Sequence, residues 1–168
     1  LSLAGLSAYR FTGLVDPHGV FAGTEQGETF GYAVALNVTP EAYMEGLRAA
    51  SPKRFKNWRR LDSKMEREVG AVRIEASDDP AIYEQLMAWK REQLVRTGLA
   101  DFMRPDWMRA LLGNFAVARG PLRGLTLTLW AGDQIAAGHF GVVQGDWFHP
   151  WVASTNPALG EYSPGQTF

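Results

Sequence analysis

The chain has 168 residues, of which 46% are hydrophobic and 21% are charged, the size and composition of one globular domain with a substantial core. Its formal net charge of -1 excludes the strong positive field of a non-specific nucleic-acid binder, so we do not expect a nucleic-acid partner, and any anion site must be local. There is no cysteine, which excludes disulfides, thiolate zinc sites and cysteine nucleophiles.

Nothing in the chain predicts a membrane span or a second domain. No apolar run approaches the roughly 18 residues that a spanning helix needs, and the first residues carry no basic leader. We therefore expect a cytoplasmic protein with one domain over residues 1–168. Residue 1 is not Met and residue 168 lies within a turn-rich motif, so we also expect the sequence to be part of a longer protein.

The first half of the chain predicts two strands and then two helices. Strand-like runs at 9–15 and 29–37 flank a Gly/Pro loop, and the assignment of residues 1–37 rests on little else. Thr39 and Ser51 each precede a proline, which predicts two helix starts. The expected buried residues of the first helix are Tyr43, Leu47 and Ala50. Those of the second, which ends near Gly70, are Phe55, Trp58, Leu61 or Asp62, Met65 and Val69.

The second half predicts a strand, two helices and a meander. A strand at 71–76 precedes a helix that starts at Pro80 and runs to about residue 97, and Pro105 opens another helix. From Leu122 the apolar period changes to two, and glycine-aspartate turns separate three runs that end near Ser154. This order predicts the α+β class, with a largely antiparallel twisted sheet and helices on both faces.

Two groups of cationic residues are candidates for ligand contacts. Arg59 and Arg60 end a cation-rich run on the second helix, which is either a solvated face or an anion site for a CoA phosphate or an acidic acceptor. Lys90 falls in the middle of an apolar stripe of its helix. Its stem either passes the apolar neighbours to reach water, or its amine enters a cleft and contacts a substrate or a buried carboxylate.

The last predicted strand contains His149 and Pro150. Proline cannot donate to a ladder, so Pro150 predicts a bulge, an edge or a place where the next strand diverges and leaves backbone groups free for a ligand. His149 is either a packed histidine or a general base, and His139 and His18 are weaker candidates. The three histidines lack ligand-type spacing with carboxylates, so we predict no metal site.

The chain ends in a turn, Ser163-Pro164-Gly165, where a helix is expected to begin. A glycine allows close approach of a ligand to the backbone, and a helix start offers unpaired N–H groups to a pyrophosphate. Glu161 precedes this turn and is either a solvated loop residue or a base. There is neither a Gly-x-Ser-x-Gly elbow nor a Walker-type phosphate loop, which argues against hydrolases and nucleotide triphosphatases.

Several motifs together resemble the GNAT-type acetyltransferase domain of bacterial proteins of cellulose and exopolysaccharide synthesis, a relative of the Fem peptidyltransferases. The matching features run from about Val38 to Phe168. They are the helix starts at Thr39 and Ser51, the helix that carries Trp89 and Lys90, the hairpin from Leu127 to Ala136, and the turn at Ser163. The resemblance says little about the first 37 residues.

The resemblance implies an acyltransferase that uses acetyl-CoA. It implies that the bulged strand pairs with the pantetheine and that the turn and the helix after it hold the pyrophosphate. These positions are Trp151, Val152, Ala153, Tyr162, Ser163, Pro164, Gly165, Gln166 and Thr167. We assign Arg59, Arg60, Lys90 and Trp130 to the acceptor. The family continues with the rest of the cofactor helix and further strands, which this sequence lacks.

These features lead to one expected activity and two alternatives. We expect direct N- or O-acetyl transfer from acetyl-CoA to a small-molecule, sugar or polysaccharide-precursor acceptor, with Glu161 or His149 as general base. One alternative is a Fem-like transferase that uses aminoacyl-tRNA, against which the near-zero net charge argues mildly. The other is a binding or scaffold module without catalysis. Assembly as a homodimer is left open.

Overall fold

The computed structural model describes residues 19–24, 27, 34 and 37–168. Both strands predicted before residue 38 lie outside the described residues, apart from positions 34 and 37. The chain divides into two compact units, Leu1–Gly46 and Leu47–Phe168. In the first unit, a turn over 19–24 is closed by the N–H groups of Ala22 and Thr24, which donate to the carbonyls of Gly19 and Phe21 at 3.2 and 3.0 Å.

The two helices predicted at Thr39 and Ser51 are both present. Helix α1 covers Pro40–Ala50, and the Thr39 hydroxyl accepts a hydrogen bond from the Ala42 N–H at 3.3 Å, as expected for a cap. Helix α2 covers Pro52–Glu68 and buries Leu61 and Met65 on the predicted face. Of the face predicted for α1, Tyr43 and Leu47 are half-buried and Ala50 is exposed, and no residue of this helix is fully buried.

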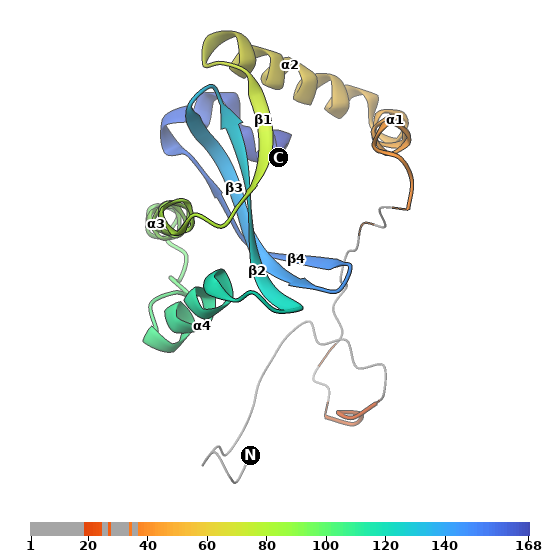
Figure 1. The fold of residues 1–168 in the computed structure, drawn as a ribbon. Coiled ribbons are helices and arrows are strands. Elements are labelled where there is room, and N and C mark those ends of the chain that lie inside the picture. The colour runs from red at the N-terminus through yellow and green to blue at the C-terminus, as the bar shows by residue number, and fades with distance from the viewer. Residues whose placement is uncertain (1–18, 25–26, 28–33, 35–36) are drawn as a thin grey trace. The chain divides into compact units, whose positions relative to one another are not determined.

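Within the described part of the chain, four strands form one antiparallel sheet in the order β1-β2-β3-β4 (Figure 1). Strand β1 covers Val72–Ser77, β2 covers Leu122–Ala131, β3 covers Gln134–Gln144 and β4 covers Trp147–Thr155. The two hairpin turns contain Gly132 and Gly145 at φ angles of 56° and 55°, a left-handed conformation that glycine adopts without steric cost. The predicted α+β class and the meander are confirmed.

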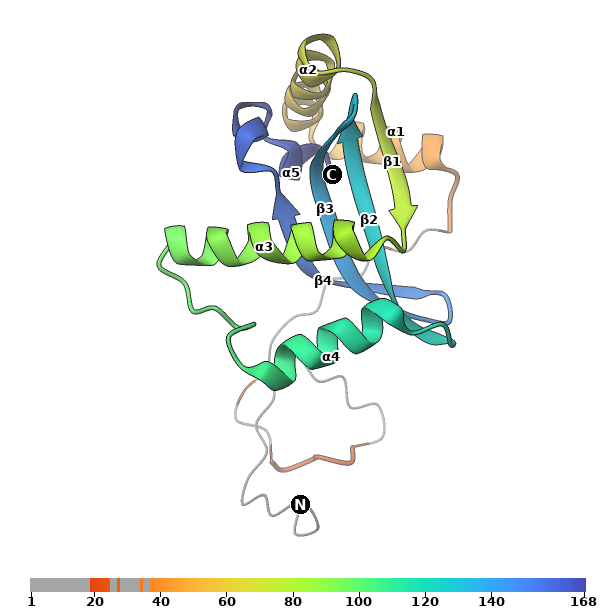
Figure 2. The same cartoon turned by 60° about the vertical axis from the view of Figure 1, so that its left-hand side comes forward.

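Helices α3 (Pro80–Arg96) and α4 (Asp106–Val117) cover one side of the sheet, the α3–α4 face, where α3 crosses in front of the strands in Figure 2. Asp79 caps α3 by accepting the N–H of Ala81 at 2.8 Å. Gly138 of β3 allows close packing, since a Cβ there would lie 2.5 Å from a methyl group of Leu86. The buried cluster on this face comprises Tyr83, Leu86, Met87, Leu94, Met103, Leu112, Phe140 and Val152.

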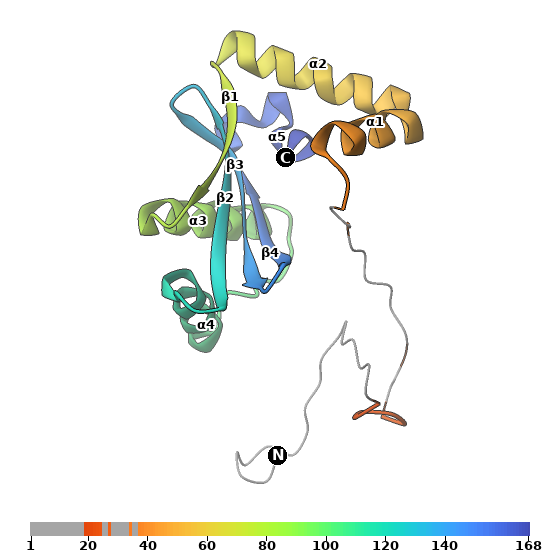
Figure 3. The ribbon, with the colours of Figure 1, turned by 45° about the vertical axis from the view of Figure 1, so that its right-hand side comes forward.

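The other side of the sheet, the α2–α5 face, is covered by α2, a 3-10 helix η2 (Pro157–Tyr162) and the short helix α5 (Pro164–Thr167), as Figure 3 shows. Three alanines in the sheet leave room for these elements to approach. The buried cluster here comprises Met65, Leu129, Ala131, Ala136, Ala137, Leu159 and Tyr162, with Val69, Val72 and Phe168 packed at its margin. Helices therefore cover both faces, as predicted.

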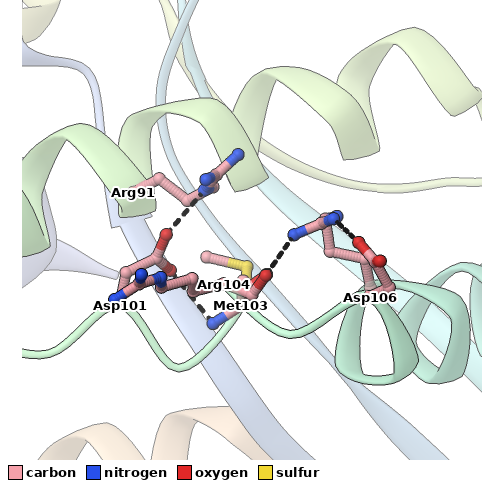
Figure 4. A network of polar contacts seen from close by, with 6 residues as sticks. Arg91, Asp101, Met103, Arg104 and Asp106 are labelled. Carbon is pink, nitrogen blue, oxygen red and sulfur yellow. Dashed lines mark hydrogen bonds and ion pairs between the residues drawn. The ribbon is translucent and has the colours of Figure 1, made fainter.

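The connection between α3 and α4 is held by Asp101 (Figure 4). Its carboxylate accepts hydrogen bonds from Arg91 Nε at 2.9 Å and from the Met103 N–H at 3.0 Å. Burial would raise the pKa of Asp101, but these two bonds and the positive charges of Arg91 and Arg109 outweigh it and lower the pKa. Arg109 of α4 donates to the carbonyls of Met103 and Arg104, so the connection is fixed to both helices.

Candidate functional site

Strand β4 lies at the edge of the sheet and carries a bulge. Phe140 of β3 pairs with Val152, and the next residue, Gly141, pairs with Pro150, so Trp151 is an extra residue in β4. Trp151 packs on Phe115 of α4 with ring centroids 5.5 Å apart, and Val152 belongs to the α3–α4 cluster, so two consecutive side chains lie on one face. This confirms the irregularity predicted from Pro150.

An exposed row of rings precedes the bulge. His149 stacks on Trp147, with centroids 6.3 Å apart and planes inclined by 23°, and both side chains are exposed. Trp147 and Trp151 are 61% and 47% exposed. His149 therefore lies two residues from the bulge, and its imidazole reaches solvent.

The turn after η2 has an unusual backbone. Ser163 has φ 49° and ψ 51°, and it is the one non-glycine residue with a positive φ among the described residues. Its hydroxyl does not cap α5. A Cβ at Gly165 would lie 3.0 Å from the Thr155 methyl, so glycine at this position lets α5 approach β4. Residues held in such conformations recur at ligand sites, which makes this turn a candidate for binding.

Glu161 is not the isolated loop residue that one reading of the sequence suggests. Its Oε2 accepts a hydrogen bond from Lys64 Nζ of α2 at 2.6 Å, and the Lys64 ammonium lies 4.7 Å from the Tyr162 ring centroid. The bond to Glu161 raises the pKa of Lys64. The Tyr162 hydroxyl donates to Glu68 at 3.3 Å, so two α2 residues hold the segment before the turn. The sequence signal for Lys64 was only its place on the charged side of α2.

His139, a weaker candidate from the sequence, lies close to the last residue of the chain in the structure. It lies on the central strand β3, opposite Ala153 in the ladder, and its ring centroid is 4.7 Å from that of Phe168. It is half-buried, and burial lowers its pKa below the ordinary 6.5, so the imidazole is neutral at pH 7. The period of two in β3 already placed His139 on the opposite face from Phe140, but no sequence signal linked it to the final turn.

Three buried polar atoms on α2 and α5 have no hydrogen-bond partner within the described part of the chain: Trp58 Nε1, Asp62 Oδ1 and Thr167 Oγ1. Burial is the main cause that raises the pKa of Asp62, and Glu66 adds to it while Arg59 opposes it. Such groups cost free energy unless water or a ligand satisfies them. Thr167 belongs to the segment that we assigned to pyrophosphate binding.

The four residues assigned to the acceptor do not form one group. Arg59 and Arg60 are exposed on α2, and Arg60 donates to Asn57 of its own helix at 3.1 Å. Lys90 is half-buried on α3, across the sheet, and donates to Gln93 at 3.1 Å. Trp130 donates to the Thr128 hydroxyl at 2.9 Å, and Arg73 lies 4.8 Å from the Trp130 ring centroid.

Among residues 19–24, 27, 34 and 37–168, no group of three or more His, Asp or Glu side chains is arranged to hold a metal ion. No helix in this part of the chain has the length and apolar character needed to cross a membrane.

The sequence profile of the acetyltransferase (GNAT) domain family matches residues 52–168. The chain belongs to this family. The match starts at the first residue of α2 and contains the whole sheet, so α2 is part of the GNAT domain. Acyl transfer is the general chemistry of the family. No curated protein and no solved structure matches the chain.

Proposed function

We propose that this GNAT domain transfers an acetyl group from acetyl-CoA to an amine or hydroxyl of a small-molecule, sugar or polysaccharide-precursor acceptor in the cytoplasm. The observation that carries the proposal is the bulged edge strand β4, which is followed within the same chain segment by the strained Ser163 turn and the start of α5. An edge strand offers backbone groups to a ligand, and a turn before a helix offers N–H groups to phosphate.

Residues at the end of the chain fit the phosphates of the donor. Ser163 and Thr167 have hydroxyls without a partner among the described residues, and Gly165 is exposed and carries no side chain of its own. The backbone of Trp151, Val152 and Ala153 would hold the pantetheine arm along the edge of β4. Tyr162, Pro164 and Gln166 complete the turn. When bound, acetyl-CoA supplies an activated acyl thioester.

Transfer to an amine requires the amine to lose its proton. An amine with a pKa near 10.4 is deprotonated at pH 7 at a cost of roughly 4–5 kcal/mol, so a base or a desolvating site is needed. We favour His149 as this base, because it is exposed two residues from the bulge, whereas one carboxylate oxygen of Glu161 is bonded to Lys64. Backbone N–H groups released by the bulge would polarise the acyl carbonyl.

The first experiment measures whether acetyl-CoA raises the thermal unfolding midpoint of the protein. We expect a concentration-dependent rise for the wild type, since a ligand that binds the folded state stabilises it. Gly165→Trp should abolish the rise by covering the turn. Gly160→Trp is the matched control, because Gly160 is exposed in η2 and a Cβ there meets nothing within 4 Å. Equal shifts for both variants would contradict the proposed donor site.

The second experiment assigns the base through acetyl transfer to a panel of amine and sugar acceptors. His149→Ala should reduce kcat about 10²–10⁴-fold, as loss of a general base does. Glu161→Gln and His139→Gln are tested beside it. If His149→Ala keeps full activity and His139→Gln loses it, the base is on β3 and the assignment to β4 is wrong.

The same measurements separate the alternatives. A Fem-like transferase would consume aminoacyl-tRNA and leave acetyl-CoA unused. A binding or scaffold module would show no turnover with either donor. Sedimentation of the protein with and without acetyl-CoA tests for a homodimer.

A further inference from the structure

A cavity of about 280 Å³ lies on the α3–α4 face, away from the residues assigned to acetyl-CoA. It is formed where the start of α3 and the end of α4 meet β2 and β3. Its lining comprises Ser77, Asp78, Asp79, Pro80, Tyr83, Glu84, Gly113, Ala116, Val117, Arg119, Gly124, Thr126 and Phe140. The volume lies just below the range of small-molecule pockets, which is roughly 300–1,000 Å³.

Two hydroxyls on largely buried side chains line this cavity, and neither has a hydrogen-bond partner among the described residues. Thr126 of β2 is 5% exposed and Tyr83 of α3 is 8% exposed, and neither hydroxyl donates or accepts in this part of the chain. The buried hydroxyl of Ser154, on the same face, does have a partner and donates to the Leu86 carbonyl at 2.7 Å. The hydroxyls of Thr126 and Tyr83 are therefore available to bond water or a ligand in the cavity.

The rim of the cavity is acidic. Asp78, Asp79 and Glu84 face a single cation, Arg119, which lies 3.7 Å from Asp78. One oxygen of Asp79 caps α3, and Glu84 has no partner within the described residues. The positive end of the α3 dipole amounts to about half a charge, so it is smaller than the excess of two negative charges on the rim. The net field therefore favours a cation.

The floor of the cavity is apolar and aromatic. Tyr83 and Phe140 meet edge to face with ring centroids 5.0 Å apart, and Ala116 and Val117 of α4 complete the wall. Burial, with a smaller effect of the Glu84 charge, raises the pKa of Tyr83 to about 12, so its hydroxyl stays protonated at neutral pH. Aromatic rings beside carboxylates are the surroundings in which proteins bind organic ammonium ions.

We propose that this cavity binds a small organic ammonium ion, with its apolar body on Tyr83 and Phe140 and its charged nitrogen at the rim beside Glu84. The hydroxyls of Tyr83 and Thr126 give the ligand further polar contacts. The site is distinct from the proposed donor site, with which it shares no residue. It is connected to it through the sheet, because Phe140 pairs with Val152 of β4.

The experiment is a calorimetric titration of the protein with 2-phenylethylamine in the absence of acetyl-CoA, so its outcome is independent of the proposed acetyl transfer. The titration is repeated with 2-phenylethanol and phenylacetate, which have a similar apolar body and a neutral or negative end. We expect saturable binding of the amine, at least about tenfold weaker binding of the alcohol, and none of the acid, as the charge on the rim requires.

Substitutions locate the ligand within the protein. Glu84→Gln should weaken amine binding about threefold to fivefold, as for a partly exposed ion pair, whereas Glu92→Gln, an exposed residue of the same helix outside the cavity, should leave it unchanged. Thr126→Val keeps the side-chain shape and should weaken binding about twofold to tenfold.

A filling substitution gives the strongest test. A Cβ at Gly113 meets nothing within 4 Å, so Gly113→Phe places its ring in the cavity and should abolish amine binding, while Gly113→Ala should leave it measurable and stabilise α4. The melting transition of each variant reports folding. A dissociation constant weaker than about 10 mM for the wild type, or equal binding of the three probes, would overturn the proposal.

Discussion

The two faces of the sheet are packed in different ways. On the α3–α4 face, long side chains such as Leu86 and Phe140 fill the space between sheet and helices, and a cavity with two unpartnered hydroxyls remains. On the α2–α5 face, alanines let α2 approach the sheet, and Lys64 joins that helix to the last turn of the chain. The first face is stabilised by the burial of large apolar side chains. The second combines close packing with polar contacts around the proposed donor site.

The largest expected effects come from truncating the central side chain of each face. Phe140 and Met65 are both 0% exposed. Phe140→Ala should lower the free energy of unfolding by about 3–5 kcal/mol, and Met65→Ala by about 2–5 kcal/mol, through lost burial and the space left behind. Urea unfolding measures both. A loss below 1 kcal/mol for either variant would show that its face relaxes around the deletion, and the comparison of the two faces would fail.

A smaller effect is expected where β4 is bonded to α3. Ser154 is 3% exposed and donates to the Leu86 carbonyl at 2.7 Å. Ser154→Ala should cost about 1–2 kcal/mol, because it removes the only buried side-chain hydroxyl bond that the described residues make between these two elements. Ser63→Ala, on the exposed side of α2, is the control and should change stability by less than about 0.5 kcal/mol. Equal losses in the two variants would contradict the role of the bond.

The α2–α5 face should respond to acid through His139. Its folded-state pKa is lowered by burial, so the unfolded chain binds the proton more tightly than the folded one. The contribution of His139 is therefore complete above pH 6.5 and is lost as the pH falls through the folded-state pKa, with a slope below about 1.4 kcal/mol per pH unit. Urea unfolding of the wild type and of His139→Gln at several pH values tests this, and identical slopes would refute it.

The smallest effect should come from the contact between Lys64 and Glu161. Lys64→Met should lower the melting midpoint less than Ser154→Ala does, because both charged groups reach solvent, where ion pairs contribute little. Added salt should reduce the difference from the wild type. Lys53→Met, an exposed residue of the same helix, is the control. If Lys64→Met were as costly as Met65→Ala, polar contacts would dominate the α2–α5 face.

Much of the fold could be predicted from local signals. Thr39, Ser51 and Pro80 mark helix starts because capping and the fixed φ of proline act within a single turn, and the period of two after Leu122 marks strands for the same local reason. The absence of buried residues from α1 could not be predicted. An apolar stripe shows which side of a helix would be buried, but only the tertiary structure decides whether it is.

Less of the candidate site than of the fold could be predicted from the sequence. Pro150 predicted an irregular strand because proline removes a ladder donor, and the bulge followed at the next residue. The contact of Lys64 with Glu161, across 97 positions, has no local signature, and neither does the burial of His139 beside Phe168. The cavity on the α3–α4 face was missed for the same reason, since its lining comes from β1, β2, β3, α3 and α4 together with the adjoining loops.

The extra residue in β4 changes which positions of the strand face each side of the sheet. Before the bulge, odd-numbered residues such as His149 lie on the α3–α4 face of the sheet. After it, even-numbered residues lie there, so Val152 and Ser154 enter the core, whereas Thr155 faces α5. Deleting Trp151 alone would join Pro150 to Val152 and restore a regular ladder with β3, in which His149, Val152 and Ser154 keep their common face. The bulge, and with it the irregular edge of the proposed donor site, therefore depends on a single residue.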